Sequence, residues 1–219
     1  MSPPDPTRDA DTRHRLLAAA GEEFSRVGFR AANVRDICAA AEANVAAVNY
    51  HFGSKEALYR QVWEHASRDM VAAEPMPTLA AHADPAEALT DFMRWFMRLV
   101  LIEGTGHTCA GSMLAQEAAE PTGALSVFVE HGAAPIRKEL RRIVSAILGR
   151  GANRRVVDDL TNAVIALCVN PKHSSEILTR LGFPPPTTAA AINRMAERLA
   201  DFALHGLIGL SPDAPTEEP

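Results

Sequence analysis

The sequence has few of the features that mark several common classes of protein. Aromatic residues make up 5% of the 219 residues, and the three cysteines (Cys38, Cys109 and Cys168) are scattered without a CxxC pair. The scattered cysteines argue against a disulfide framework or a zinc site, and they fit a reducing compartment. No run approaches the roughly 18 apolar residues of a membrane span, and the polar N-terminus lacks a signal peptide's apolar region. We therefore expect a cytoplasmic protein that does not contact membranes.

Catalytic motifs are also missing. The sequence holds no GxSxG, no HExxH and no glycine-rich phosphate loop. His107 and Cys109 are close in sequence, but residues two apart point in different directions on a helix, and nothing orients the histidine. His173 and Glu176 form only a weak pair at metal-ligand spacing. We expect no enzyme activity, no metal and no cofactor.

Positive charge is scarce for a protein that would bind nucleic acid. The formal net charge is −5, from 22 Lys and Arg against 27 Asp and Glu. Residues 1–60 carry eight of each sign, so the acidic excess lies in residues 61–219. A binding domain in the first part would make few phosphate contacts and show a modest dependence on salt. Arg8, Arg13 and Arg15 form either a flexible arm near the DNA backbone or simply a solvated terminus.

What the sequence does contain is helical periodicity, with no strand alternation and no internal repeat. Helices are expected at 12–26, 33–41, 45–52, 54–73, 84–103, 109–119, 121–148, 154–169 and 187–208. The seventh is expected to kink near Gly132 or Pro135. Residues 74–83 read as a linker and residues 170–186 as partly irregular, with a helical turn or two at 175–181. The expected fold is all-α with about nine helices.

The most informative segment is residues 28–55, where two short helices are joined by a tight polar turn. In the second helix Val48 and Phe52 fall on the inner face. Its outer side presents the residues that we expect to face DNA, together with Lys55 just beyond the helix: Val45, Ala46, Ala47, Asn49, Tyr50 and His51. Asparagine can bond adenine, small apolar groups can touch the thymine methyl, and Tyr50, His51 and Lys55 suit phosphates. The alternative is an ordinary αα-hairpin.

Residues 12–60, which include this segment, resemble the DNA-binding domain of the TetR/AcrR family of transcriptional regulators. The run from Asn44 to Lys55 is similar to the pattern A-N-x-A-A-x-N-Y-H-F-G-x-K of its CecR-like subgroup, and residues 116–124 resemble the R-E-x-x-x-P-T-x-A pattern of the same subgroup. Two departures stand out in the first domain. Ala31 and Ala32 replace a usual threonine, which removes one hydroxyl for phosphate. Glu42 stands where glycine is commonest in the turn, so we expect a changed turn or repulsion of a phosphate.

The family resemblance implies a three-helix helix-turn-helix domain at residues 1–60 with a flexible N-terminal arm. It also implies a helical ligand-binding and dimerisation domain at 61–210, and residues 211–219 read as a disordered tail. Dimerisation is expected through the last two long helices, because paired reading heads match palindromic operators. The expected contacts are Leu160, Val164, Leu167, Ile192, Met195, Leu199 and Phe202. The alternative is that these residues form an intramolecular core.

Large adaptable side chains in the middle of the chain are the candidates for a small-molecule chamber. The residues proposed to line it are Met93, Trp95, Phe96, Met97, His107, Met113, Glu117 and Phe128. The same stripe could equally be plain core. The expected function is a ligand-responsive regulator, most simply a repressor that binds an operator in double-stranded DNA and is released by a small apolar or amphipathic ligand. The alternative is a helical small-molecule-binding or interaction protein that has lost DNA binding.

Overall fold

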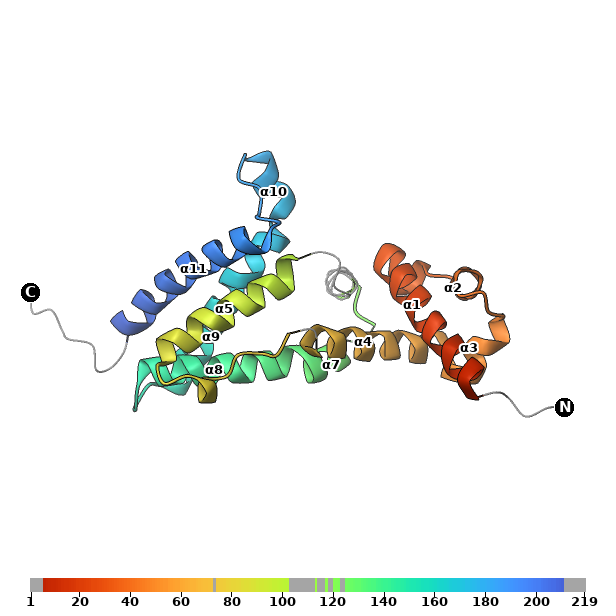
Figure 1. Cartoon of the computed structure of the whole chain (residues 1–219), viewed down its shortest axis with the longest axis horizontal. Helices are drawn as coiled ribbons and strands as arrows, with labels where there is room; N and C mark the ends of the chain where they lie inside the picture. Colours follow the sequence, from red (N-terminus) through yellow and green to blue (C-terminus); the bar gives the residue numbers. More distant parts are fainter. Residues whose placement is uncertain are drawn as a thin grey trace, which may run out of the picture. The chain divides into compact units, whose positions relative to one another are not determined.

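The computed structural model describes residues 6–72, 74–102, 113, 117, 120–122 and 125–210, and all regular structure within them is helical (Figure 1). None of the helices in these ranges is long and apolar enough to cross a membrane. The described residues form two compact units. The first unit consists of the described residues up to Ala72 and of the described residues between 113 and 132. The second unit consists of residues 74–102 and 133–210. Residues 1–60 fall within the first unit, and a domain boundary after residue 60 stays a prediction.

The first unit is a small helical bundle whose elements match the sequence pattern closely. Its helices are α1 (Pro6–Ala31), α2 (Val34–Ala40), α3 (Val45–Phe52), α4 (Lys55–Ala72) and the short α7 (Leu125–Phe128). The main difference is that α1 begins six residues before the expected start. Arg13 and Arg15 therefore belong to a helix, not to a flexible arm. Near its end α1 bends at Gly28, whose φ of 81° is accessible to glycine at little cost.

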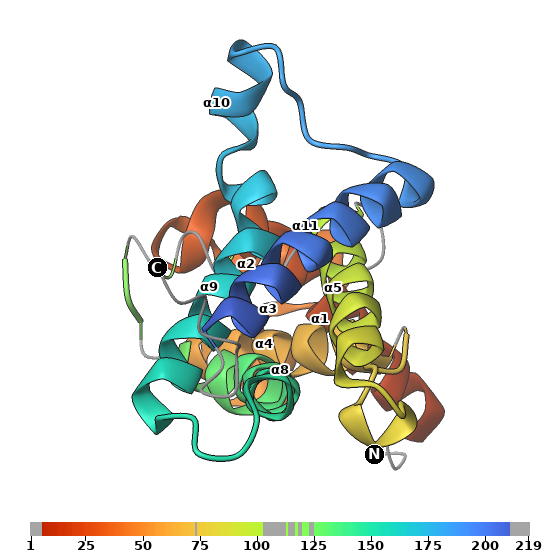
Figure 2. The ribbon, with the colours of Figure 1, turned by 90° about the vertical axis from the view of Figure 1, so that its left-hand side faces the viewer.

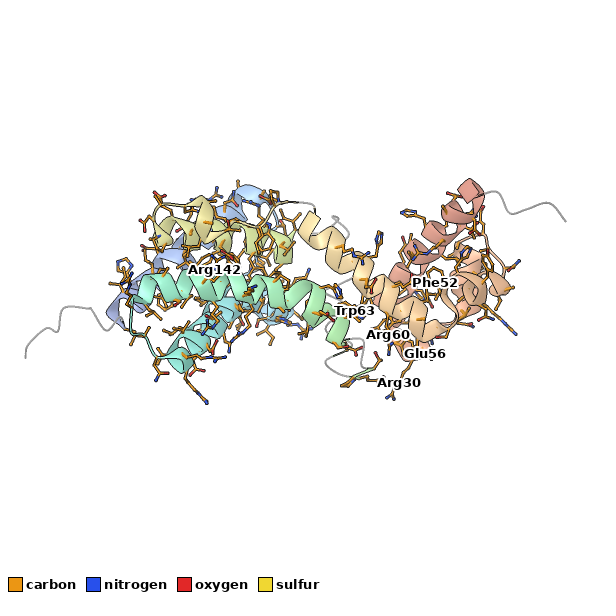
Figure 3. The ribbon with its side chains drawn as sticks, turned by 90° about the horizontal axis from the view of Figure 1, so that it is seen from below. Arg30, Phe52, Glu56, Arg60, Trp63 and Arg142 are labelled. Atoms are coloured by element: carbon orange, nitrogen blue, oxygen red, sulfur yellow. The ribbon has the colours of Figure 1, made fainter. Side chains whose placement is uncertain are left out.

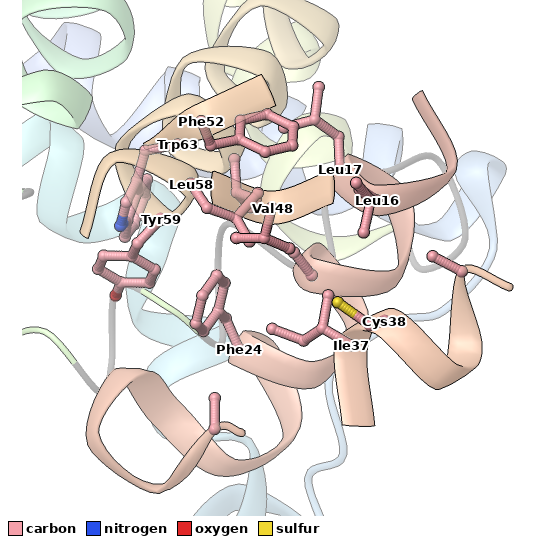
Figure 4. Close-up of a cluster of buried hydrophobic side chains, with 14 of the residues drawn as sticks. Leu16, Leu17, Phe24, Ile37, Cys38, Val48, Phe52, Leu58, Tyr59 and Trp63 are labelled. Atoms are coloured by element: carbon pink, nitrogen blue, oxygen red, sulfur yellow. The ribbon is translucent and has the colours of Figure 1, made fainter. Parts of the chain in front are cut away.

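Apolar side chains from α1, α2, α3 and α4 pack together in one core (Figure 4). Leu16 and Phe24 of α1, Ile37 of α2 and Leu58 of α4 are fully buried, and Val48 of α3 is 1% exposed. These residues recur at helical spacing in the sequence, which is why the pattern predicted the fold. The core fixes α3 by two anchors on its inner face, so its outer face is held in a defined orientation.

The turn between α2 and α3 is built by backbone hydrogen bonds that enclose Glu42. The amide of Ala43 donates to the carbonyl of Cys38 at 2.9 Å, and the amide of Glu42 donates to Ala39 at 3.2 Å. This pair of bonds is the Schellman motif, which requires a left-handed residue after the helix. Glu42 supplies it with φ 49°. The turn geometry is therefore kept despite the absence of glycine, contrary to the expectation of a changed turn.

The second unit is built from α5 (Pro85–Leu101), α8 (Ala134–Leu148), α9 (Arg154–His173), α10 (Ser175–Arg180) and α11 (Ala189–Gly209), preceded by the short 3₁₀ helix η1 (Leu79–Ala81) (Figure 2). Helix α5 packs against α8, α9 and α11. The kink expected near Gly132 takes the form of a π-helical turn, η2 (Val129–Ala133), ahead of α8. The expected helix at 109–119 lies outside the described residues except for Met113 and Glu117.

One boundary in the second unit was predicted wrongly. Helix α9 was expected to end at residue 169, before Pro171, but it continues to His173. A proline inside a helix removes one amide donor, and this one lies in the last turn, where few bonds remain to be lost. Pro171 is buried, and the amide of Ser174 closes the helix by donating to the carbonyl of Asn170 at 2.8 Å. The turn expected at 175–181 is helix α10.

Polar contacts fasten η1 and the linker to α5. The Nδ1–H of His82 donates to the Thr78 carbonyl at 3.0 Å, and the Nε2 of His82 lies 3.0 Å from the Asp91 carboxylate. The contact with the Thr78 carbonyl, and then that with Asp91, raises the pKa of His82. The indole of Trp95 donates to the carbonyl of Glu74 at 2.9 Å. The expected linker at 74–83 is therefore held on the helix by specific bonds.

Candidate nucleic-acid interface

Helix α3 owes its orientation to a cap and two anchors. The side chain of Asn44 accepts a hydrogen bond from the amide of Ala47 at 2.9 Å and so satisfies one of the free donors at the helix start. Val48 and Phe52, one turn apart, are 1% and 7% exposed. Gly53 ends the helix with φ 81°. These contacts leave the opposite face of α3 open to solvent.

The open face of α3 consists of small and polar residues around one tyrosine. Tyr50 is 69% exposed and Val45 is 45% exposed, and Ala46 and Asn49 are exposed beside them. Ala47 is half-buried and packs partly on the core. The helix surface is therefore smooth apart from Tyr50 and Asn49. Such a surface can enter a major groove closely and bring an amide to the base edges.

His51 lies differently from the other residues expected to face DNA. Its side chain is only 7% exposed, and its Nε2 atom lies 3.6 Å from a carboxylate oxygen of Asp9 on α1. Its ring meets that of Tyr50 edge-on, with 4.9 Å between the centroids. The structure thus places His51 as a support that connects α1 to Tyr50.

Lys55 is also drawn toward α1. Its ammonium lies 4.8 Å from the centre of the Phe29 ring and donates to the carbonyl of Arg30 at 3.4 Å. A contact that sequence reasoning missed lies nearby: Arg13 stacks on the Phe52 ring at 5.5 Å and bonds Gln61 of α4. The repeated apolar positions gave no signal for this contact, because Arg13 lies 39 residues before Phe52 and 48 residues before Gln61.

The start of α4 offers a second set of donors. Ser54 caps this helix by accepting from the amide of Ala57 at 3.1 Å. Helix N-termini favour anions, but Glu56 already occupies this one, and the backbone hydrogen bond it receives lowers its pKa. Glu56 and Arg60 stand one turn apart on α4 (Figure 3). The charge at this end of the helix is therefore mixed.

Comparisons with known proteins decide the family. Residues 16–62 match the family described as bacterial regulatory proteins, tetR family, and residues 85–207 match the C-terminal domain of the HTH-type transcriptional dual regulator CecR. The second match alone spans more than half of the chain. The chain belongs to the TetR family and is CecR-like. It is a transcriptional regulator, and proteins of this type are not enzymes.

Individual relatives agree with this assignment. The chain is 28% identical over 211 residues to the HTH-type transcriptional dual regulator CecR of Shigella flexneri, covering 89% of this chain and 92% of that protein. It is 37% identical over 82 residues to the HTH-type transcriptional repressor NicS of Pseudomonas putida, covering 37% and 38%. The solved structure of the flavonoid-responsive regulator FrrA shares the fold, with a TM-score of 0.62 at 22% identity over 90% of this chain and 97% of that one.

In this TetR-family regulator, the residues proposed to line a ligand chamber divide between the two units. Met93, Trp95, Phe96 and Met97 are buried in the core of the second unit. Met113, Glu117 and the half-buried Phe128 belong to the first, where Phe128 packs on Trp63 with 5.2 Å between the ring centres. His107 lies outside the described residues. Each group is packed among side chains of its own unit, and ligand contact remains a prediction for all of them.

Glu117 borders a cavity of about 420 Å³ within the first unit. Its carboxylate is 1% exposed and accepts from the amide of Thr122 at 2.7 Å and from the hydroxyl of Tyr59 at 3.3 Å. Burial raises the pKa of Tyr59 to about 12, so this phenol keeps its proton and donates. The cavity is also lined by the end of α1, residues 27–31. A buried carboxylate therefore ties α4 to residue 122 of the same unit.

The residues proposed for the dimer contact fall into two groups in the TetR-family regulator. Phe202 is 68% exposed, and Leu160, Leu167, Met195 and Leu199 are half-buried. Val164 and Ile192 are instead buried in the protomer, at 3% and 0% exposure, because they lie on the inner faces of α9 and α11. The half-buried and exposed members form one apolar stripe on α9 and one on α11.

Proposed function

We propose that this TetR-family regulator is a repressor that binds a palindromic operator in double-stranded DNA as a homodimer and is released by a small apolar or amphipathic ligand. The observation that carries the DNA-binding part is the outer face of α3. It is a short helix fixed by buried anchors, with Tyr50 and Asn49 open to solvent. A buried or blocked face would have argued for a helical protein that has lost DNA binding.

Each residue on this face has a role that follows from its chemistry. Asn49 bonds an adenine edge, and Ala46 and Ala47 contact thymine methyl groups. Tyr50 donates to a phosphate and fixes the register of the helix. Val45 lies at the leading end of α3, where it contacts the DNA backbone or a base edge. His51 acts indirectly, because its edge-on contact with the tyrosine ring limits the orientations of Tyr50.

Lys55 is proposed to contact the DNA backbone just beyond α3. Its tether to the carbonyl of Arg30 and to the Phe29 ring holds the ammonium in one region, which reduces the entropy lost on binding a phosphate. The N-terminus of α4 would add little, since Glu56 stands there. Few cations face the DNA in this arrangement, so affinity depends on both protomers binding together.

The apolar stripes of α9 and α11 support the dimer. Leu160 and Leu167 lie two turns apart on α9, and Met195, Leu199 and Phe202 follow one another at three- and four-residue spacing on α11. Two such helices from each protomer would form a four-helix contact with two-fold symmetry. A dimer of this kind presents two copies of α3, which suits a palindromic operator.

Ligand release is proposed as a shift between two spacings of the paired α3 helices. A ligand that prefers the spacing incompatible with DNA shifts the equilibrium by no more than its differential affinity. Regulation in either direction fits the relatives of this chain, since CecR is called a dual regulator and NicS a repressor. FrrA is called flavonoid-responsive, which fits a small-molecule signal for a protein of this fold.

Selection from a pool of random duplexes tests the proposal. The wild-type chain should enrich one palindromic sequence at low salt. Asn49→Ala should relax preference at one base pair, whereas Tyr50→Ala should weaken all sequences by a similar factor. Tyr50→Phe serves as the matched control, because it keeps the ring and removes only the hydroxyl; it should behave like Tyr50→Ala if that hydroxyl binds phosphate. Absence of any enriched sequence would contradict DNA binding, and unchanged affinity in both alanine variants would contradict the role of α3.

A further inference from the structure

Positive side chains gather around a hollow between α8 and α9, within the second unit. The hollow has a volume of about 500 Å³ and is lined by Ala134, Arg137, Lys138, Arg141, Arg154 and Asp158. Four cationic side chains and one carboxylate leave three formal positive charges there, in a chain whose formal charge is −5. The hollow therefore has the opposite sign to the protein as a whole.

The sequence of α8 explains both the charge and the space. Ala134, Arg137, Lys138 and Arg141 recur at i, i+3, i+4 and i+7 and so share one face of the helix. The core residues of α8, such as Leu140, lie on another face and are buried. Ala134 is exposed and has only a methyl group, so the longer cationic side chains surround open space instead of a filled surface.

Asp158 of α9 holds the two guanidinium groups of α8 in place. The Nε of Arg141 donates to its Oδ1 at 2.8 Å, and the Nη2 of Arg137 donates to the same oxygen at 3.0 Å. The Nε of Arg137 also donates to Asn162 at 3.3 Å. The bond from Arg141, and then that from Arg137, lowers the pKa of Asp158, so the carboxylate stays charged. A guanidinium has five N–H donors, more than these bonds use.

Two further features of α9 favour an anion at this hollow. Arg154 is the first residue of this 20-residue helix, so the positive end of the helix dipole opens here. The hollow also lies away from the proposed dimer contact. Arg154 and Asp158 are one turn apart on one side of α9, whereas Leu160 and Leu167 face the nearly opposite side, by the helical repeat of about 3.6 residues.

We propose that this hollow binds the phosphate groups of a small molecule that carries two or more phosphates. Two phosphate groups carry roughly three to four negative charges at neutral pH, which matches the three positive charges. Arginine forks bind phosphate oxygens in pairs, and the two on α8 are already oriented by Asp158. This site is distinct from the reading face of α3 and from the apolar residues proposed for the inducer. The regulator would then bind a second, anionic small molecule.

Calorimetric titration of the full chain with inorganic pyrophosphate tests this site. Lys138→Ser and Arg154→Ser should each weaken pyrophosphate binding by about threefold, the scale of one exposed charge pair. Arg155→Ser is a closely matched control: its side chain is 87% exposed against 88% for Arg154, and it pairs with Asp159 outside the hollow. It should leave the affinity unchanged. Arg142 of α8, which pairs with Glu139, provides a second control through Arg142→Ser (Figure 3).

The outcomes separate a built site from general charge. Saturable pyrophosphate binding that is weakened about threefold in each of the two hollow variants and unchanged in the two controls would support the proposal. No binding would overturn it, as would equal weakening by Arg154→Ser and Arg155→Ser, or equal competition by sulfate at matched ionic strength. If the hollow variants lose operator affinity but keep pyrophosphate affinity, the cations contact the DNA backbone and the small-molecule proposal is wrong. The proposed function is tested separately, by operator binding of the wild-type chain. Its failure is therefore distinguishable from failure of the pyrophosphate site.

Discussion

Glycine at position 42 should make the chain more stable than alanine does at the same position, because Glu42 holds a backbone conformation that suits glycine. Its φ is 49°, and the Schellman bonds to Cys38 and Ala39 require that value. A side chain in the left-handed region costs about 1–2 kcal/mol. Against this, glycine loses more backbone entropy on folding, by roughly 0.5–1 kcal/mol.

A second term comes from the Glu42 carboxylate, which lies 3.8 Å from Arg15 with 85% of its side chain exposed. So exposed a pair contributes between about 0 and 1 kcal/mol, and Glu42→Ala removes it while keeping the strained φ. Comparing Glu42→Gly with Glu42→Ala therefore isolates the backbone. The glycine variant should be more stable by roughly 0.5–1 kcal/mol, the difference between the strain and entropy contributions.

Thermal unfolding at equal protein concentration measures this difference. For a chain of this length, the glycine variant should melt about 1–4 °C above the alanine variant. Both lack the carboxylate, so neither the ion pair nor the change in net charge contributes. If the two variants melt together, or if alanine melts higher, the turn stores no strain at Glu42 and the reasoning is refuted. Binding of the enriched operator by Glu42→Gln then reports any repulsion of phosphate, since this variant keeps the strain and loses the charge.

Three other substitutions probe the remaining contacts. Phe202→Glu should leave the melting temperature of the protomer nearly unchanged, because the ring is 68% exposed. In sedimentation velocity the variant should be monomeric at concentrations where the wild-type chain is dimeric. An unchanged dimer would contradict the contact through α11. Tyr59→Phe should destabilise the chain by about 1 kcal/mol in chemical unfolding by losing its bond to the buried Glu117 carboxylate, whereas an unchanged midpoint would mean that the 3.3 Å contact contributes nothing. Because the pKa of His82 is raised, His82→Gln should lower stability most below the unfolded pKa of about 6.5, and the difference from wild type should close as pH rises through the folded value; a gap that does not change with pH would refute this.

Periodicity predicted the first four helices, α1 to α4, well because their caps and inner faces are set by residues close together in sequence. Asn33 and Asn44 cap helices in the structure as their position before apolar runs indicated, and Val48 and Phe52 are buried at the spacing that made them inner-face residues. The same spacing could not reveal that His51 turns inward. Its partner, Asp9, lies more than forty residues earlier in a helix whose start was expected later.

The C-terminal region shows where sequence reasoning ran short. Apolar stripes on α9 and α11 were recognised, but a helix that is apolar on two sides does not reveal which side packs inside the protomer. The structure separates them: Val164 and Ile192 are buried, and Phe202 is open. The spacing of the cations on α8 is visible in the sequence, but their contact with α9 is not. Arg137 and Asp158 are 21 residues apart, and only the packing of α8 on α9 brings the guanidinium of Arg137 to the carboxylate of Asp158.

The face of α3 that we propose to bind DNA carries little charge. On the outer face of α3 the exposed residues Ala46, Asn49 and Tyr50 are uncharged, and Lys55 beyond it is already tethered to α1. A single head of this kind gains little from counterion release, which is the main source of non-specific DNA affinity. In the proposed dimer, useful affinity would then come from two copies of α3 held at a fixed spacing, where the second contact forms at a high effective concentration. A change of that spacing would remove most of the binding energy at once. The proposed control by a ligand that acts only on geometry therefore suits a protein with so little electrostatic affinity.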